Sequence, residues 1–553
     1  MDAAPDAPAV VHAKAGEEPF RWRRGELLAA ASRYAAQLAA EGVRPGDVCA
    51  LIVRHHRDFY PLYLGVAAIG ALPAVLAYPN PRLHPAKFRE GLMGMSRRSG
   101  LDWLLVERDL EAIVRPLTAG SGSTIRELLF PLEWNRGAGE VMEVFPPGPA
   151  DDAAPCLLQH SSGTTGLQKP VVLSHRAVLE HVSVYSRSIA LSPSDRVVSW
   201  LPLYHDMGLI AAFHLPLASG IPTMQLDPFE WVAAPILLLE AIAAERGTLT
   251  WLPNFAYNLL ADRCRDDEME GIALDSMRMF INCSEPVRAE SHARFLARFA
   301  RYGVRPEMLA ACYAMAETTF AATQTAPGEP ARVVAASREA LAEGRVRSAG
   351  AGDVVRACVS SGRPIAGCVV EAVDGERRRL PAGQVGELRI RSGSMFDGYR
   401  HYPEKTAEVL ADGWYYSGDY GFIDGGECFV VGRKKDIVII AGKNIYPEDV
   451  EDLVGNIDGV LPGRVVAFGV DDDALGTEQL CVVAETECAG DDAQGRLRRR
   501  IVEAAMQIDI TVSRVYLVSP RWLVKSSSGK PSRNGNRVRV LEELGAAAAA
   551  QTE

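Results

Sequence analysis

The sequence predicts an α/β protein built around a largely parallel sheet. Between about residues 26 and 311, short apolar runs of strand length alternate with longer segments whose apolar residues recur at helical spacing. Such alternation is typical of parallel sheets covered by helices. The chain has 553 residues. Because one hydrophobic core seldom serves more than about 250–300 residues, we expect more than one domain.

The expected elements follow in chain order. Residues 1–20 are rich in alanine, proline and acidic side chains, and we expect them to be poorly ordered. Residues 26–41 predict an amphipathic helix, because the apolar residues from Leu27 to Leu38 share one face and Gly42 is a C-terminal signal. Further strands are expected at 48–53, 74–77, 156–158, 171–173, 196–200, 248–252 and 308–311, and further helices at 59–69, 208–217, 234–244 and 289–302.

Residues 318–360 break this rhythm with proline, glycine and small polar side chains. They predict an insertion of irregular structure that includes one short helix. Strands expected at 367–373, 386–391 and 428–431 then predict a β-rich, barrel-like subdomain. A strand at 437–440 and a helix at 447–454 open a last segment. We therefore expect one domain over 1–433 and a second over 434–553, with the boundary at about 433–436 and a frayed tail at 545–553.

Composition narrows the class of protein. A net charge of −11 argues against a dedicated nucleic-acid binder. The N-terminus lacks the pattern of a signal peptide, and no apolar run reaches 18 residues, so we expect no membrane span. The ten cysteines include no C-x-x-C pair, which argues against zinc sites and disulfide frameworks. These features predict a cytoplasmic, reducing-compartment protein.

A loop rich in glycine and hydroxyl groups lies between the strands expected at 156–158 and 171–173. Its glycines allow backbone N–H groups to point inward, while hydroxyls and a lysine add donors and charge, a combination suited to a polyphosphate. The spacing differs from that of a Walker loop. A polar surface hairpin is the alternative. The candidate residues are Ser161, Ser162, Gly163, Thr164, Thr165, Gly166 and Lys169.

Four later positions carry charges suited to nucleotide chemistry. Glu317 follows a predicted strand, where a lone carboxylate fits Mg²⁺ bound to phosphates, although a helix N-terminal acid is the alternative. Asp419 in Ser-Gly-Asp can accept hydrogen bonds from a ribose diol, or can simply form a turn. Arg433 is a ribose or phosphate contact, or a basic surface turn. Lys530 ends a Ser/Gly loop and can stabilise charge in phosphoryl displacement, unless that loop is only surface.

Taken together, these motifs resemble the adenylate-forming superfamily of acyl-CoA synthetases, peptide-synthetase adenylation domains and luciferases. The resemblance covers about residues 20–540 and rests on five motifs in matching order, Ser162-Gly-Thr-Thr-Gly-x-x-Lys169, Tyr313-x-x-Ala-Glu317, Ser417-Gly-Asp419, Gly432-Arg-x-x-Asp436 and Ser527-Ser-Gly-Lys530. It implies a large N-terminal domain with two mainly parallel sheets flanked by helices plus the barrel-like subdomain. A small, mobile α+β C-terminal domain would rotate about Lys435.

The resemblance also implies roles for single residues. The loop from Ser161 to Lys169 would hold the ATP phosphates, Glu317 the magnesium ion, and Asp419 with Arg433 the ribose. Lys530 would bridge the substrate carboxylate and the α-phosphate. Ser284, Glu285, Pro286 and Tyr313 would form the adenine pocket. His205 would lie near the acyl carboxylate; the alternative is that His205 and Asp206 cap a helix.

Within the superfamily, the pair Ala316-Glu317 and the 318–360 insertion are similar to fatty acyl-AMP ligases. In that group the insertion restrains the C-terminal domain, and the acyl group passes to the phosphopantetheine arm of a carrier protein. The expected activity is therefore ATP- and Mg²⁺-dependent activation of a carboxylic, and most often fatty, acid. An acyl- or aryl-CoA synthetase and a degenerate adenylate-binding protein remain as alternatives. Pro170, Ala314 and Val524 depart from the superfamily pattern.

Overall fold

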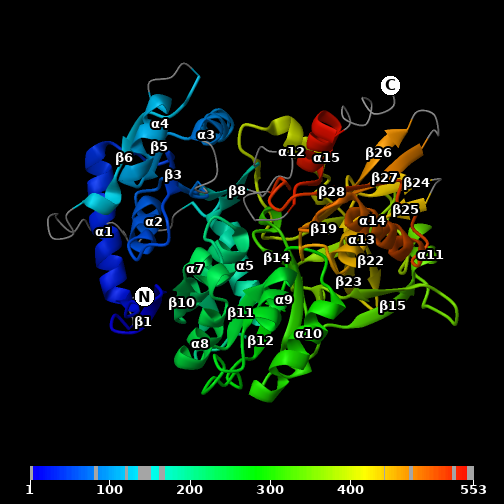
Figure 1. The fold of residues 1–553 in the computed structure, drawn as a ribbon. Coiled ribbons are helices and arrows are strands. Elements are labelled where there is room, and N and C mark those ends of the chain that lie inside the picture. Colours follow the sequence, from blue (N-terminus) through cyan, green and yellow to red (C-terminus); the bar gives the residue numbers. More distant parts are fainter. Residues whose placement is uncertain are drawn as a thin grey trace.

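The computed structural model describes residues 4–79, 85–118, 122–134, 151–160, 169–440, 443–472, 477–525 and 531–544. It has a large N-terminal domain with two mainly parallel sheets and a smaller C-terminal domain (Figure 1). The predicted fold class is therefore confirmed. Within the described ranges, no helix is long and apolar enough to cross a membrane.

The first sheet has the strand order β17-β14-β13-β12-β11-β9-β10-β1-β2 within the described residues. Neighbours from β13 to β1 run parallel, whereas β2, β14 and β17 add antiparallel edges. The strands are β1 Pro8–Ala13, β2 Phe20–Arg23, β9 Val197–Ser199, β10 Thr223–Leu226, β11 Leu249–Leu252, β12 Met279–Asn282, β13 Leu309–Ala314, β14 Ala321–Gln324 and β17 Arg363–Pro364.

The second sheet has the order β20-β8-β7-β4-β3-β5-β6. Its β7–β8 pair is the predicted hairpin around the glycine-rich loop, with His160 opposite Pro170. The strands are β3 Val48–Ile52, β4 Leu72–Val75, β5 Trp103–Val106, β6 Glu127–Leu129, β7 Pro155–His160, β8 Pro170–Ser174 and β20 Gly398–Tyr399.

Helices cover these sheets, as the alternating pattern predicts. The first ends at Gly42, whose φ of +102° favours glycine. The helix expected at 208–217 is instead a π-helix, η4 Met207–His214, followed by a short α-helix. The α-helices are α1 Arg24–Glu41, α2 Phe59–Ala68, α3 Pro85–Ser99, α4 Glu111–Val114, α5 His175–Ser188, α6 Leu215–Ser219, α7 Pro228–Ala233, α8 Ile236–Glu245, α9 Asn254–Arg263 and α10 Ala289–Phe299.

Two expectations are wrong, that residues 1–20 are poorly ordered and that residues 318–360 are irregular. The N-terminal segment 1–20 contains β1, which inserts between β10 and β2 with Val10 and Val11 almost fully buried. The insertion at 318–360 is not irregular: it contains β14, and β15 Val333–Ser337 pairs antiparallel with β16 Val355–Val359. Its strands lack a clear hydrophobic pattern, because only the last two residues of β15 and of β16 are buried. The one short helix expected there is α11 Arg338–Ala342.

The β-rich region that follows is an antiparallel sheet, in which β23 pairs with β22 beside the order β18-β19-β22-β21. Its elements are β18 Val369–Val373, β19 Gly386–Arg391, β21 Leu410–Ala411, β22 Trp414–Asp424, β23 Glu427–Arg433 and the neighbouring helix α12 Pro403–Val409.

The C-terminal domain has a hydrophobic core of its own, in which Val450, Val482 and Ile501 are fully buried. Its β26-β27-β28 sheet lies in the orange-to-red part of Figure 1. The elements are β24 Val438–Ile440, β25 Lys443–Ile445, α13 Pro447–Gly455, β26 Val465–Asp472, β27 Thr477–Glu485, α14 Asp491–Met506, β28 Arg514–Val518, α15 Arg533–Arg539 and a last π-helical turn, η8 Val540–Leu544. The alanine-rich tail at 545–553 lies outside the described residues.

Candidate nucleotide-binding site

Tyr313, Asp419 and Arg433 converge from three strands. Tyr313 lies near the end of β13, and its hydroxyl donates a hydrogen bond to Oδ2 of Asp419 at 2.7 Å. Arg433, opposite Asp419 on β23, places its Nε 3.5 Å from Oδ1 of the same carboxylate. Burial raises the pKa of Asp419, while the arginine charge acts in the other direction. Three residues that the sequence placed far apart thus form one cluster.

Glu317 lies in a short 3₁₀ turn directly after β13, and only 7% of the residue is exposed. The carboxylate accepts a hydrogen bond from the hydroxyl of Tyr399 at 2.7 Å. Two residues further on, Thr319 adopts a φ of +66°, which is strained for a β-branched residue. The predicted magnesium ligand is therefore held at the carboxyl end of a parallel strand, where α/β proteins bind ligands.

Tyr399 also reaches the glycine-rich loop, and sequence reasoning missed it. Lys169 donates to its hydroxyl at 3.4 Å, and the lysine Nζ lies 4.7 Å from the ring centre. The pairing of β20 with β8 creates this contact, with Tyr399 opposite Val171. A strand of two residues is too short to show a hydrophobic pattern. The neighbours of Tyr399 depend on which strand β20 pairs with, and the sequence does not show this.

The segment Ser284–Pro286 follows β12 and is held by the first residue of α9. The backbone N–H of Asn254 donates to Oε1 of Glu285 at 3.0 Å, and its side-chain amide donates to the carbonyl of Pro286 at 2.8 Å. Ser284 has a φ of +77°, a second strained position. Strain of this kind is often found at binding sites.

His205 lies two residues before Met207, whose sulfur contacts this segment. The ring of His205 is 4.7 Å from that of Tyr204, whose carbonyl accepts a hydrogen bond from the side chain of Gln159 on β7. Asp206 accepts the backbone N–H of Met207 at 2.9 Å, so the capping alternative holds for Asp206. Met207 in turn contacts Ser284 through its sulfur. The chain neighbours of His205 thus contact β7 through Tyr204 and the predicted adenine segment through Met207.

Several predicted residues lie outside the described ranges: Ser161, Ser162, Gly163, Thr164, Thr165, Gly166 and Lys530. The residues that flank them are described. Pro170 opens β8, a position that proline tolerates in a strand, and its carbonyl accepts the N–H of Arg400 at 2.9 Å. At the other loop, Lys525 pairs with Pro531 in an antiparallel bridge.

Charged side chains of both signs gather where the two domains join. Burial lowers the pKa of Lys435, and the charges of Arg433 and Lys169 lower it further. One residue on, Asp436 binds Arg533 at 2.7 Å, and this arginine also pairs with Glu448 at 2.8 Å. The predicted hinge segment is thus surrounded by charged partners from both domains.

The residues present fit magnesium carried by a nucleotide. Among the described residues, no group of three or more His, Cys, Asp or Glu side chains could hold a metal ion alone. Glu317 is instead a single buried carboxylate beside the segment that leads from the glycine-rich loop. Since Mg²⁺ usually takes one or two carboxylates and completes its shell with phosphate oxygens and water, this arrangement suits a nucleotide-bound ion.

The insertion contacts the C-terminal domain through two arginines. Arg338 at the start of α11 and Arg356 on β16 both pair with Asp449 on α13, the latter at 3.0 Å. Arg356 also lies over the ring of Tyr446, 4.7 Å from its centre. The hydroxyl of Tyr446 donates to the carbonyl of Leu341 at 3.4 Å. Figure 1 shows α11 beside the elements of the C-terminal domain.

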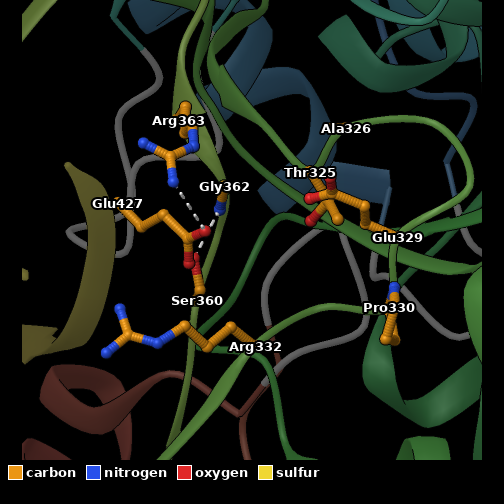
Figure 2. Close-up of a pocket in the computed structure, with 9 residues that line it drawn as sticks. All are labelled: Thr325, Ala326, Glu329, Pro330, Arg332, Ser360, Gly362, Arg363 and Glu427. Carbon is orange, nitrogen blue, oxygen red and sulfur yellow. Dashed lines mark hydrogen bonds and ion pairs between the residues drawn. The ribbon is translucent and has the colours of Figure 1, made fainter. Parts of the chain in front are cut away.

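The described residues include one small cavity and one open cleft in the large domain. A cavity of about 20 Å³ between β14 and β23 has room for one water and contains none of the predicted site residues (Figure 2). There, Arg363 and Glu427 form an ion pair at 3.8 Å. An open cleft of about 560 Å³ borders β20 and includes Tyr399 in its lining.

Comparison with known proteins gives consistent matches. The model of a family described as AMP-binding enzyme matches residues 1–400. A protein from Caulobacter vibrioides, provisionally named an acyl-CoA synthetase, is 30% identical over 531 residues, 95% of this chain and 90% of its own length. The medium-chain-fatty-acid–[acyl-carrier-protein] ligase JamA of Moorena producens is 34% identical over 404 residues, 70% of this chain and 67% of its own.

Among solved structures, one from a study of fatty acyl-adenylate ligases from E. coli and L. pneumophila has a TM-score of 0.89 at 24% sequence identity. The match covers 98% of this chain and 96% of that chain. At this identity the match shows that the fold is shared across both domains.

Proposed function

Because the chain belongs to the AMP-binding enzyme family, we propose that it activates a fatty acid with ATP and then acylates a carrier protein. The product of the first step is an acyl-adenylate, and pyrophosphate is released. In the second step the acyl group passes to the phosphopantetheine thiol of the carrier. The name of JamA, a medium-chain-fatty-acid–[acyl-carrier-protein] ligase, supports both steps. We also propose that the protein works in the cytoplasm, since all ten cysteines are free thiols.

The chemistry of the first step is an in-line displacement. A carboxylate oxygen of the acid bonds to the α-phosphorus, and the bond from that phosphorus to the bridging oxygen breaks. Pyrophosphate leaves with the electron pair. The protein's task is to align the acid with the phosphate and to offset the negative charge.

Each part of the site has a role in that task. In the proposal, the Ser161–Lys169 loop holds the β- and γ-phosphates, Tyr313 packs on adenine, and Asp419 with Arg433 holds the ribose. Glu317 would hold Mg²⁺, which supplies charge neutralisation to the phosphates when bound. His205 and Lys530 would orient the acid carboxylate and stabilise the charge at the α-phosphate.

In the second step, the thiol sulfur bonds to the acyl carbonyl carbon and AMP leaves with the electron pair of the broken bond. The thiol proton passes to solvent. We propose that the C-terminal domain, residues 434–553, turns about the 433–436 hinge between the steps. Its separate hydrophobic core supports this division.

The choice of a carrier protein over CoA as the acyl acceptor rests on one observation. The insertion at 318–360 contacts the C-terminal domain. Arg338 and Arg356 both bind Asp449, and the three side chains are only 11–19% exposed. Because a buried charge without its partner is costly, rotation of the C-terminal domain must break a strong contact. This restraint favours a carrier protein over free CoA, as in the fatty acyl-AMP ligases that the sequence resembles.

An acyl-CoA synthetase is the second candidate, and the provisional name of the Caulobacter relative favours it. A binding protein without turnover is less consistent with the site, because Glu317, Asp419 and Arg433 are all present and placed together. Whether the acyl group passes to a carrier protein or to CoA therefore distinguishes the first two candidates.

The test supplies a panel of acids with ATP and Mg²⁺ and measures pyrophosphate release. The acyl acceptor is then either a phosphopantetheine-loaded carrier protein or CoA at equal concentration. We expect medium or long aliphatic acids to release pyrophosphate and the carrier to be acylated faster. Faster acyl-CoA formation would establish the second candidate, and no release with any acid would refute both.

A further inference from the structure

Tyr399 lies between two charged groups that the proposed function assigns to magnesium and phosphate. Its hydroxyl donates to Oε1 of Glu317 at 2.7 Å and accepts from Nζ of Lys169 at 3.4 Å. A single hydroxyl thus connects the turn after β13 with the beginning of β8. The proposed roles of Glu317 and Lys169 do not include this connection.

Several contacts fix the position of the phenol. The residue is 4% exposed, and its ring centre lies 5.0 Å from that of Phe396. Its backbone N–H donates to Oγ1 of Thr406 at 2.9 Å. The N–H of Phe396 donates to the carbonyl of Glu317 at 2.9 Å, so the segment from 396 to 399 holds both the backbone and the side chain of this glutamate.

The direction of the hydrogen bonds is also fixed. The ammonium group of Lys169 has only hydrogens to donate, so the hydroxyl oxygen of Tyr399 accepts from it. The one hydrogen of the hydroxyl is then donated to Oε1 of Glu317.

We propose that Tyr399 is a positioning residue that fixes Oε1 of Glu317, leaves the second carboxylate oxygen for magnesium, and holds Lys169 beside the polyphosphate. This inference rests on the proposed function. Some residues form a hydrogen bond to a metal-ligating side chain without touching the metal. Replacing such a residue typically weakens metal affinity by about 10–100-fold, because the ligating side chain is then ordered only when the metal binds. The cost of losing the phenol should therefore fall on the metal-bound nucleotide more than on ATP alone.

The test compares wild type with Tyr399→Phe, which removes the hydroxyl and keeps the ring that faces Lys169. Mn²⁺ replaces Mg²⁺ as a spectroscopic probe, and its binding in the presence of ATP is followed by electron paramagnetic resonance. ATP affinity without metal is measured by calorimetry. We expect about 10–100-fold weaker Mn²⁺ binding and ATP affinity within about twofold of wild type. The Mg²⁺ concentration for half-maximal pyrophosphate exchange should rise in parallel.

Tyr402→Phe is the matched control, because Tyr402 is three residues away and borders the same cleft. It should match wild type in all three measurements. Wild-type Mn²⁺ binding by Tyr399→Phe would overturn the inference, as would an equal loss of ATP affinity without metal.

Thermal melting first confirms that each variant folds. If Tyr399→Phe does not fold, Tyr399→Gln takes its place, because its shorter amide cannot occupy the position of the hydroxyl. Weaker Mn²⁺ binding by this variant supports the inference, and wild-type binding overturns it. A wild-type protein that binds neither ATP nor Mn²⁺–ATP would refute the proposed function itself.

Discussion

At the scale of single residues, Asp419 shows how the proposed site would be prepared for a nucleotide. Its two carboxylate oxygens are already engaged, one by Tyr313 and one by Arg433. Each oxygen of a carboxylate has a second lone pair, so the group can still accept hydrogen bonds from a diol. A site whose acceptor is oriented before the ligand arrives loses less side-chain entropy on binding.

Lys530→Ala tests the charge that the proposal places at the α-phosphate. Pyrophosphate exchange should fall by about 10²–10³-fold, the usual effect of removing one stabilising donor. ATP binding, measured by calorimetry, should stay close to wild type. Lys525→Ala is the control, because Lys525 lies at the described base of the same loop. Normal acyl-adenylate formation by Lys530→Ala would contradict the assignment.

At the scale of elements, α13 connects the two domains through opposite charges. Its Asp449 binds two arginines of the insertion, Asp452 pairs with Arg288 of the large domain, and its Glu448 binds Arg533 of its own domain. The carboxylates of α13 therefore contact arginines of both domains. The contact between the two domains consists of ion pairs as well as apolar packing.

Asp449→Asn should weaken that restraint. Arg356 would keep a hydrogen-bonding neighbour but lose its charge partner, which should lower the free energy of unfolding by up to about 3 kcal/mol. Adenylation should persist, and acyl-CoA formation should rise relative to carrier acylation. Asp458→Asn, at an exposed position just beyond α13, is the control. Unchanged acceptor preference in a destabilised Asp449→Asn would show that this contact does not restrain the domain.

These elements also show what the sequence could predict. Periodicity located α1, β3 and β13 within a few residues, because each pattern is local. The resemblance selected Tyr313, Glu317, Asp419 and Arg433, and the fold brings them together. Tyr399 and the Asp449 contacts could not be predicted, because they depend on which strands pair and which domains touch. The strands β15 and β16 were missed because their mostly exposed faces need no alternating hydrophobic pattern.

At the scale of the whole molecule, burial of neutral histidines sets the response to acid. Burial lowers the pKa of each of five histidines from 6.5 to about 3 or 4; they are His12, His160, His181, His214 and His292. They lie in both sheets of the large domain and in helices that cover them. Below pH 6.5 the unfolded chain binds protons that the folded chain does not.

The contribution of these histidines to the free energy of unfolding should therefore be at its maximum above about pH 6.5. It should decline steadily as the pH falls to about 4. Four carboxyl groups whose pKa values are raised by burial act in the opposite direction, and the five histidines outnumber them; they are Asp397, Asp419, Glu451 and Asp452. Urea unfolding at pH 7.5, 6.5, 5.5 and 4.5 measures the effect. His401→Gln, an exposed position, should leave the slope unchanged. A flat profile between pH 7 and 5 would contradict this account.

The place of β1 in the first sheet has a consequence for synthesis on the ribosome. Val10 pairs with Thr223 and Ala13 with Leu226, so the first strand has no parallel neighbour until more than two hundred residues have been added. At about 5–20 residues per second, that interval is roughly 10–40 s. During this time the edge of β1 that will pair with β10 stays open, so we expect chaperones, or the short hairpin with β2, to keep β1 from aggregating.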